Sequence, residues 1–184
     1  MSNQTNIEYP AGTWDIDPAH SSVSFSVRHL MISKVKGEFG AFTGTIVTTG
    51  NPEETTVDAT IDVTSISTKE SGRDAHLNSV DFFDSEHFPN ITFVSSSLES
   101  TGKEDKYILR GDLTIRGTTK PVVLDFEFGG IVVDGYGQTK AAASAETKIS
   151  RGDFGLTWNS TLETGGVVVS DEVSIQLDIQ AVLR

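Results

Sequence analysis

The sequence predicts an all-β protein: an eight-stranded antiparallel β-barrel of the lipocalin-like kind, with one short helical segment inserted between strands. Most of the chain is divided into runs in which apolar and polar residues alternate, a period typical of strands with one buried face and one wet face. Stretches rich in glycine, asparagine and aspartate separate these runs, as expected for turns. Eight strands can close into a barrel whose interior either fills with side chains or holds one small ligand. A β-sandwich is the main alternative, because the same alternation would support it.

The first strand is expected within the run from Trp14 to Leu30. Asp17-Pro18 favours a turn inside this run. From position 22 to position 29 the even-numbered positions are serine or arginine, and the odd-numbered ones form an apolar face that carries Val23, Phe25, Val27 and His29. This face looks into either a packed core or a ligand cavity, and it ends in a histidine.

The remaining strands follow in order. A break over residues 30–36 precedes a second strand over residues 37–47, whose glycines at 37, 40 and 44 indicate the bending that barrel closure needs. Residues 117–120 are predicted to form a hairpin loop. Small residues at 141, 143 and 145 leave room beside their strand. The later strands are expected over residues 57–64, 91–95, 107–116, 122–128, 140–149 and 173–183.

The segment from Ser71 to Val80 has helical spacing instead. Arg73, His76, Leu77 and Val80 would share one face, at intervals of three and four residues. A further short turn of helix is expected over residues 81–84, and Pro89 ends the segment. A long excursion inside a β protein is more often a lid or a binding loop than a neutral insertion.

Composition narrows the class of protein. A chain of 184 residues fits a single domain, expected over residues 13–184 after a disordered polar tail at residues 1–12. With 14 Lys+Arg against 26 Asp+Glu the formal net charge is −12, so a phosphate backbone or an anionic membrane surface would repel the chain overall, and nucleic acid is disfavoured as a partner. The first residues have neither a basic nor an apolar region, so a cytoplasmic protein is expected. No apolar run approaches the roughly 18 residues of a membrane-spanning segment.

Several segments together resemble the YceI-like family of polyisoprenoid-binding, lipocalin-like proteins. The resemblance runs from about Trp14 to the C-terminus, keeps the order of the motifs, and is carried by Trp14-x-Ile16-Asp17-x-x-His20-Ser21, Phe25-x-Val27-x-His29, Gly37-x-Phe39, Gly44, Ser65-Ile66-x-Thr68, Arg73-Asp74-x-His76-Leu77, Asp81-Phe82-Phe83-Asp84, Pro89-x-Ile91-Thr92-Phe93, Gly111-x-Leu113-Thr114-Ile115-x-Gly117-Thr118-Thr119-Lys120 and Ile149-x-Arg151-x-Asp153-Phe154-Gly155-Leu156-x-Trp158-Asn159. It implies an elongated eight-stranded barrel, often a homodimer, whose apolar tunnel takes an isoprenoid or another long-chain lipid. Family members include secreted periplasmic proteins and cytoplasmic ones, and this sequence is similar to the cytoplasmic kind.

The apolar faces supply the first group of candidate ligand-binding residues. From alternation alone, ordinary core packing is the better interpretation, and the family resemblance reverses that preference. The candidates for the wall of a lipid tunnel are Phe25, Val27, Leu77, Phe82, Phe83, Phe93, Leu113, Ile115, Phe154 and Trp158.

Polar candidates for contact with a ligand head group are Arg73, His76, His29 and Asn159. Arginine offers a planar fork to carbonyl or phosphate oxygens, and histidine can donate to a quinone or phenol oxygen. Each has a structural alternative. Arg73 could pair with Asp74, Asp81 or Asp84, His29 could be a satisfied interior histidine, and Asn159 could cap a backbone group.

Metal, cofactor and nucleophile chemistry find no support in the motifs. The four histidines are far apart and match no metal-ligand spacing, the chain has no cysteine, and no Gly-x-Ser-x-Gly elbow or P-loop is present. The leading hypothesis is a non-enzymatic carrier or store for a long-chain lipid, without a cofactor. An enzyme acting on such a lipid, with His29, His76 and Asp74 as acid–base groups, is the second hypothesis. A filled barrel that serves as a stress-related interaction protein is the third.

Overall fold

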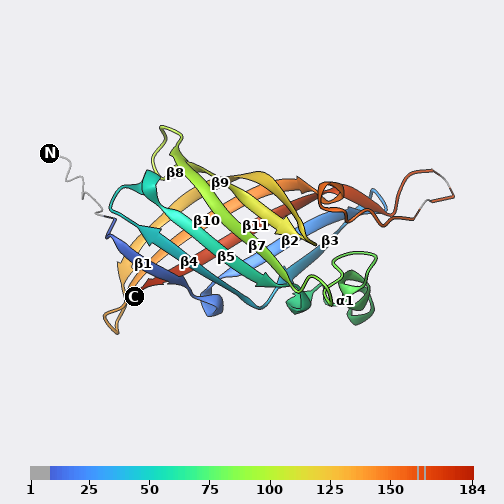
Figure 1. Ribbon diagram of the computed structural model, residues 1–184, viewed down its shortest axis with the longest axis horizontal. Helices are drawn as coiled ribbons and strands as arrows, with labels where there is room; N and C mark the ends of the chain where they lie inside the picture. Colours follow the sequence, from blue (N-terminus) through green and yellow to red (C-terminus); the bar gives the residue numbers. More distant parts are fainter. Residues whose placement is uncertain (1–8, 161, 164) are drawn as a thin grey trace.

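The computed structural model describes residues 9–160, 162–163 and 165–184. Figure 1 shows an elongated barrel with the C-terminus at one end and helix α1 at the other. The helical elements are η1 Pro18–His20, η2 Pro52–Glu54, η3 Val63–Ser65, α1 Ser71–Asn78 and η4 Arg151–Phe154. The strands are β1 Gly12–Ile16, β2 Ser22–His29, β3 Ser33–Phe39, β4 Phe42–Thr48, β5 Thr56–Asp62, β6 Ile66–Ser67, β7 Asn90–Ser100, β8 Lys106–Ile115, β9 Thr118–Val133, β10 Thr139–Ser150 and β11 Val169–Leu183.

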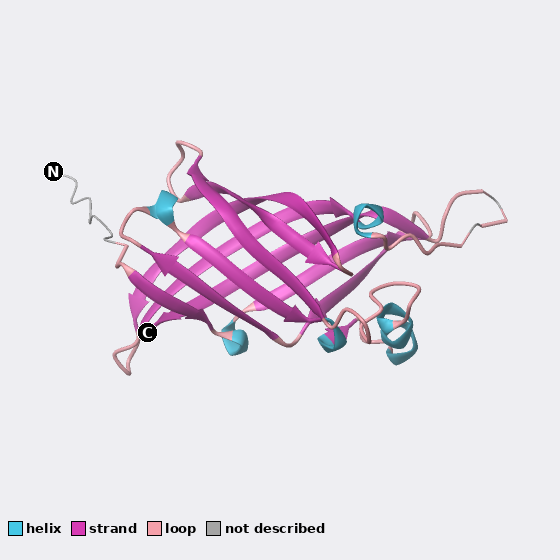
Figure 2. Cartoon of the chain, viewed as in Figure 1, coloured by secondary structure: helices cyan, strands magenta, loops and turns pink. Residues whose placement is uncertain are grey.

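The strands close into a ring. Neighbours follow the order β1-β4-β5-β7-β8-β9-β10-β11, and β11 pairs with β1 in turn. Every pairing is antiparallel, and strands wrap the whole length of the barrel (Figure 2). The predicted eight-stranded antiparallel barrel with one short α-helix is therefore confirmed, and the sandwich alternative is wrong.

Three further strands arise because the first three long strands of the barrel are each broken once. β2 pairs with β11 and β3, while β1 pairs with β11 and β4, so β1 and β2 follow one path. β3 and β4 are separated only at Gly40-Ala41, and β5 and β6 are separated by η3. The broken strands let the barrel bend between its two ends while the hydrogen-bond ladder stays nearly complete.

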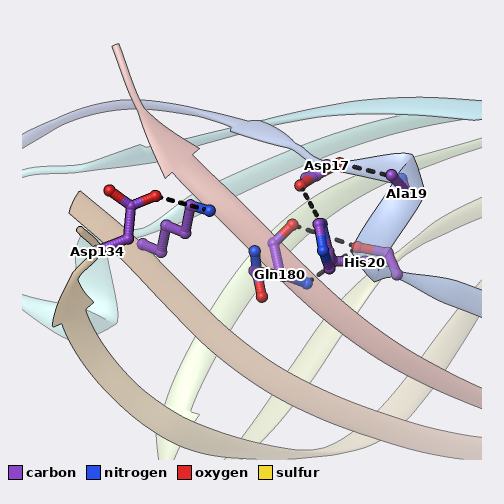
Figure 3. Close-up of polar contacts among 7 residues, drawn as sticks. Asp17, Ala19, His20, Asp134 and Gln180 are labelled. Atoms are coloured by element: carbon purple, nitrogen blue, oxygen red, sulfur yellow. Dashed lines mark hydrogen bonds and ion pairs between the residues drawn. The ribbon is translucent and has the colours of Figure 1, made fainter. Parts of the chain in front are cut away.

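The break between β1 and β2 has a clear cause in the sequence. Pro18 begins η1, and the Asp17 carboxylate accepts hydrogen bonds from Ala19 N at 3.0 Å and from His20 Nδ1 at 2.7 Å (Figure 3). These bonds, chiefly the one with His20, lower the pKa of Asp17. Gln180 of β11 stays attached across the break, because its carbonyl accepts from Asp17 N at 2.8 Å. The predicted turn at Asp17-Pro18 is confirmed.

Several predicted boundaries were wrong by a few residues. β3 already begins at Ser33, because the turn that precedes it is only three residues long. The turn before β9 is likewise confined to Arg116-Gly117, so residues 118–120 lie in the strand and not in a loop. Helix α1 ends at Asn78, where Ser79 N donates to His76 O at 3.1 Å. Val80 consequently leaves the predicted helical face, and its side chain is 65% exposed.

Contact with the barrel starts close to the beginning of the described chain. Residues 1–8 of the predicted tail lie outside the described residues. The Tyr9 ring packs 4.8 Å from the Phe128 ring between centroids, and Pro10 O accepts from Thr48 Oγ1 at 2.6 Å. In the part of the chain that the structure describes, no helix has the length and apolar character needed to cross a membrane.

Gly111 in β8 marks a place where two strands meet with no room for a side chain. A Cβ atom built on Gly111 would lie 2.5 Å from Phe93 Cζ and 2.5 Å from the backbone oxygen of Val94. We expect Gly111→Ala to lower the free energy of unfolding by about 1–3 kcal/mol in a urea titration, because the neighbouring backbone cannot yield cheaply. Gly135→Ala is the control, because a Cβ there meets open space. Equal stability of the two variants would contradict the close approach of β7 and β8.

Candidate functional site

The barrel encloses a cavity of about 260 Å³. Side chains from nearly every strand line it, because alternate residues of each strand point inward. No polar atom faces the cavity, so its surface is apolar throughout. We expect such a space to favour apolar molecules over water.

Nine of the fourteen predicted ligand-binding residues lie on the cavity wall. They come from β2, from α1 and the loop after it, from β7 and β8, and from η4. These residues are Phe25, Val27, Leu77, Phe82, Phe83, Phe93, Leu113, Ile115 and Phe154. Their contact with a ligand stays a prediction.

Phe82 and Phe83 reach the cavity because the loop after α1 folds back toward the barrel. Phe83 N donates to Leu77 O at 2.9 Å, which ties the loop to the last turn of the helix. Arg116, in the turn between β8 and β9, donates from Nη1 to Phe82 O at 2.9 Å. The helical segment therefore contributes apolar side chains to one end of the cavity.

Arg73 lies outside the cavity wall. Its Nε donates to Thr68 Oγ1 at 2.7 Å, and its Nη2 donates to Thr68 O at 2.9 Å. Asp74 accepts from the same threonine, from Thr68 N at 2.9 Å and from Thr68 Oγ1 at 2.6 Å. Arg73 forms no ion pair with Asp74, Asp81 or Asp84. The alternative that Arg73 pairs with one of these aspartates was therefore wrong. Thr68 instead joins both residues and fixes α1 to the end of β6.

His76 also lies outside the wall, behind one of its aromatic residues. Its Nε2 lies 2.8 Å from Asp81 Oδ2. Its ring stands edge-on to Phe82 at 5.1 Å and to Trp158 at 4.8 Å between centroids. Trp158 is partly buried against the core without being part of the wall. His76 and Trp158 therefore pack against the Phe82 ring and do not line the cavity themselves.

The other two polar candidates, His29 and Asn159, also lie outside the cavity wall. His29 is the last residue of β2, beside the turn to β3. Asn159 Nδ2 donates to Val169 O at 2.6 Å, and its Oδ1 accepts from Val168 N and Val169 N at 3.1 Å each. The alternative that Asn159 satisfies backbone groups is confirmed.

Arg151 is a structural residue that the site prediction missed. It is only 8% exposed, and it is the one charged residue among the described residues of the cavity wall. Its guanidinium turns away from the cavity and donates to four backbone oxygens, those of Leu156 at 2.7 Å, Ser170 at 2.9 Å, Trp158 at 2.9 Å and Val169 at 3.3 Å. Burial lowers the pKa of Arg151, but an arginine stays charged at neutral pH. The signal was in the sequence, since Arg151 continues the inward alternation of Ala145, Thr147 and Ile149.

A second, smaller cavity of about 80 Å³ lies toward the end of the barrel that holds the C-terminus. Trp14 and Tyr9 line it, and Trp14 Nε1 donates to Thr48 Oγ1 at 3.0 Å. The two cavities share four wall residues, namely Ile46, Phe126, Ala143 and Ile179. These side chains form the partition inside the barrel.

A closed antiparallel barrel with an internal apolar cavity defines the class of the protein, a class that typically encloses one small apolar ligand. The chain belongs to the YceI-like domain family, whose pattern matches residues 14–181. A UPF0312 protein of Staphylococcus aureus strain MSSA476 is 40% identical, and the match covers 87% of this chain and 91% of the relative.

Solved structures show the same fold. The Campylobacter jejuni YceI protein is 33% identical with a TM-score of 0.73, and the match covers 85% of this chain and 90% of that one. A polyisoprenoid binding domain from Saccharophagus degradans is 13% identical with a TM-score of 0.70, over 93% of this chain and 98% of that one. The second likeness concerns the fold alone.

Proposed function

We propose that the protein is a non-enzymatic carrier or store for an isoprenoid or similar long-chain amphiphile. The observation that carries this proposal is the cavity inside the barrel, with its apolar surface. A hydrocarbon chain that leaves water for such a surface gains up to about 0.8 kcal/mol per CH₂ group. A closed eight-stranded barrel is also a fold that can hold one small ligand in its interior.

The cavity is small for a long hydrocarbon chain. Its 260 Å³ lies just below the range of roughly 300–1,000 Å³ that ligand pockets usually occupy. A long chain would therefore displace side chains on the wall. The side chains that would move are those of the partition, such as Ile46 and Phe126, because their movement would join the second cavity to the first.

The arrangement favours a carrier over an enzyme. The three acid–base candidates, His29, His76 and Asp74, all lie outside the cavity wall. His76 contacts Asp81, and Asp74 accepts a hydrogen bond from Thr68. An unfilled space of this size also favours a carrier over a barrel that is simply packed with side chains.

Native mass spectrometry of protein purified from its own host, followed by organic extraction, tests the proposal. We expect one polyprenyl or quinone-type molecule per chain. Protein that carries no extractable lipid, and whose melting temperature is unchanged by added polyprenyl lipid, would contradict it.

A cavity-filling substitution links the ligand to the cavity. Ala145 is 7% exposed and lies on the wall, whereas its neighbour Glu146 points outward. We expect Ala145→Phe to reduce bound lipid at least about tenfold, because a phenyl ring displaces two or more CH₂ groups of the ligand. Glu146→Phe on the same strand should load normally, and thermal melting checks that both variants fold. Full loading of Ala145→Phe would place the ligand elsewhere.

A further inference from the structure

The turn between β2 and β3 exposes three consecutive large apolar residues. Leu30, Met31 and Ile32 are 37%, 58% and 86% exposed. Single exposed apolar residues are common on protein surfaces, but a contiguous group at a protruding tip marks an interaction site. The group is called the apolar tip below.

The turn itself gives no reason for these side chains. Leu30 and Met31 have φ angles of +53° and +61°, a region that glycine and asparagine adopt far more readily. A hairpin selected only for its turn would carry those residues. The apolar side chains therefore need an explanation outside the hairpin.

Basic residues flank the apolar tip on both strands. Arg28 of β2 stands directly opposite Lys34 of β3, and Lys36 lies one diagonal step further. All three are exposed, and none forms an ion pair with any residue that the structure describes. Like charges directly opposite each other destabilise an antiparallel pair. No acidic residue occurs from position 28 to position 37, in a chain whose net charge is −12.

The apolar tip lies at the end of the barrel where α1 and its loop line the cavity. Leu30 N donates to Val168 O at 2.8 Å, so the hairpin runs beside the loop that precedes β11. Val167 in that loop is another exposed apolar residue, at 39%. In Figure 1 the hairpin lies at the end opposite the C-terminus. On β11, the strand beside β2, Glu172 pairs with Lys148 at 3.3 Å, and Asp171 accepts from Ser150 Oγ and Gly152 N.

We propose that the β2–β3 hairpin docks the protein on the surface of an anionic lipid bilayer. The apolar tip enters the interface between head groups and acyl chains, and Arg28, Lys34 and Lys36 face the anionic head groups. This contact removes the unfavourable exposure of the tip and neutralises the opposed cations. The net negative charge does not prevent it, because charges further away than about 8 Å are largely screened at physiological salt. The proposal stands on the hairpin alone and does not require a ligand in the cavity.

Co-sedimentation with vesicles that contain no isoprenoid tests this docking. The vesicles are made of equal parts of phosphatidylcholine and phosphatidylserine, or of phosphatidylcholine alone. We expect the full chain to bind the anionic vesicles preferentially, and to bind more weakly as salt is raised. Replacing Arg28, Lys34 and Lys36 together by glutamine should weaken binding by about a hundredfold, since each cation near an anionic surface contributes roughly fivefold. Ile32→Asp should weaken binding at least about tenfold.

The hairpin between β9 and β10 supplies a matched control at the opposite end of the barrel. Val132 there is 64% exposed, but its turn carries an acidic residue, Asp134, paired with Lys140 at 2.9 Å. Val132→Asp should leave vesicle binding unchanged. Absence of binding by the unaltered protein at low salt would overturn the proposal. Equal losses for Ile32→Asp and Val132→Asp would overturn it as well, and neither result would affect the carrier proposal.

Discussion

Arg151→Met is expected to lower the free energy of unfolding by about 3–5 kcal/mol. Methionine fills much of the same volume but donates no hydrogen bond. Four backbone oxygens between Leu156 and Ser170 would lose a buried donor, in a region where water has little access. Urea titration followed by tryptophan fluorescence measures the change, and Trp158 in the affected loop gives a local signal.

The size of the effect follows from the chemistry of the guanidinium group. Its five N–H donors form a rigid planar fork, which is why one side chain can satisfy carbonyls on both sides of the loop before β11. A carboxylate of opposite charge, that of Asp171, lies near the guanidinium. Asp171 accepts hydrogen bonds from Ser150 Oγ and from Gly152 N, and these bonds lower the pKa of Asp171. Arg151→Lys should recover only part of the lost stability, because an ammonium group cannot reach all four oxygens.

Arg110→Met is the matched control for this prediction. Arg110 lies on the outside of β8 and pairs with Glu99 at 3.3 Å in water. Its replacement should change stability by less than about 0.5 kcal/mol, as for most surface substitutions. If Arg151→Met were equally mild, water must satisfy the four oxygens, and the loop would not depend on the arginine.

The fold could be predicted from the sequence because period-two alternation determines which side chains share a face. The alternation from Val23 to Val27 places Phe25 toward the interior, and Leu113 faces inward for the same reason. The breaks were harder to predict. Asp17-Pro18 is a readable turn, and Gly40 indicated bending, but the glycines at 37, 40 and 44 did not show that the strand would be interrupted at Gly40-Ala41. The ring has eight strands in either description, so these breaks changed the boundaries and not the fold.

The polar part of the site could not be predicted, because residue type does not identify a partner. An arginine on the face of a helix suits a ligand phosphate as well as a neighbouring threonine, and the structure pairs Arg73 with Thr68. His76 likewise meets Asp81 and two aromatic rings, none of which its helical spacing indicated. Apolar wall residues need only the correct face of a strand, whereas polar contacts need tertiary distances.

Leu113→Asp should destabilise the protein by at least about 3 kcal/mol at neutral pH. Leu113 is 9% exposed and faces a cavity without polar atoms, so a carboxylate there would have no partner. The expected loss is large because the charge must either remain unsolvated or draw water into the barrel. Urea titrations of the variant and the unaltered protein, in matched buffers, give the difference.

The dependence of that difference on pH shows whether the cavity is dry. Burial raises the pKa of a carboxyl group above its unfolded value of about 3.9. Below the unfolded pKa the carboxyl is neutral in both states, so the charge-dependent part of the penalty is absent. As pH rises, the unfolded chain ionises first, and the penalty grows until the folded pKa is passed. Leu113→Asn, which is similar in shape and cannot ionise, should lose stability by an amount that does not vary with pH.

The same variant connects stability to the carrier proposal. Once its carboxyl ionises, Leu113→Asp should release a bound hydrocarbon chain, because the chain cannot solvate the charge and water must replace it. Loading of the variant should therefore fall as pH rises, while loading of Leu113→Asn should not change. A pH-independent difference in stability would mean that water already reaches position 113. The cavity would then be a hydrated space, and an apolar chain would gain far less on entering it.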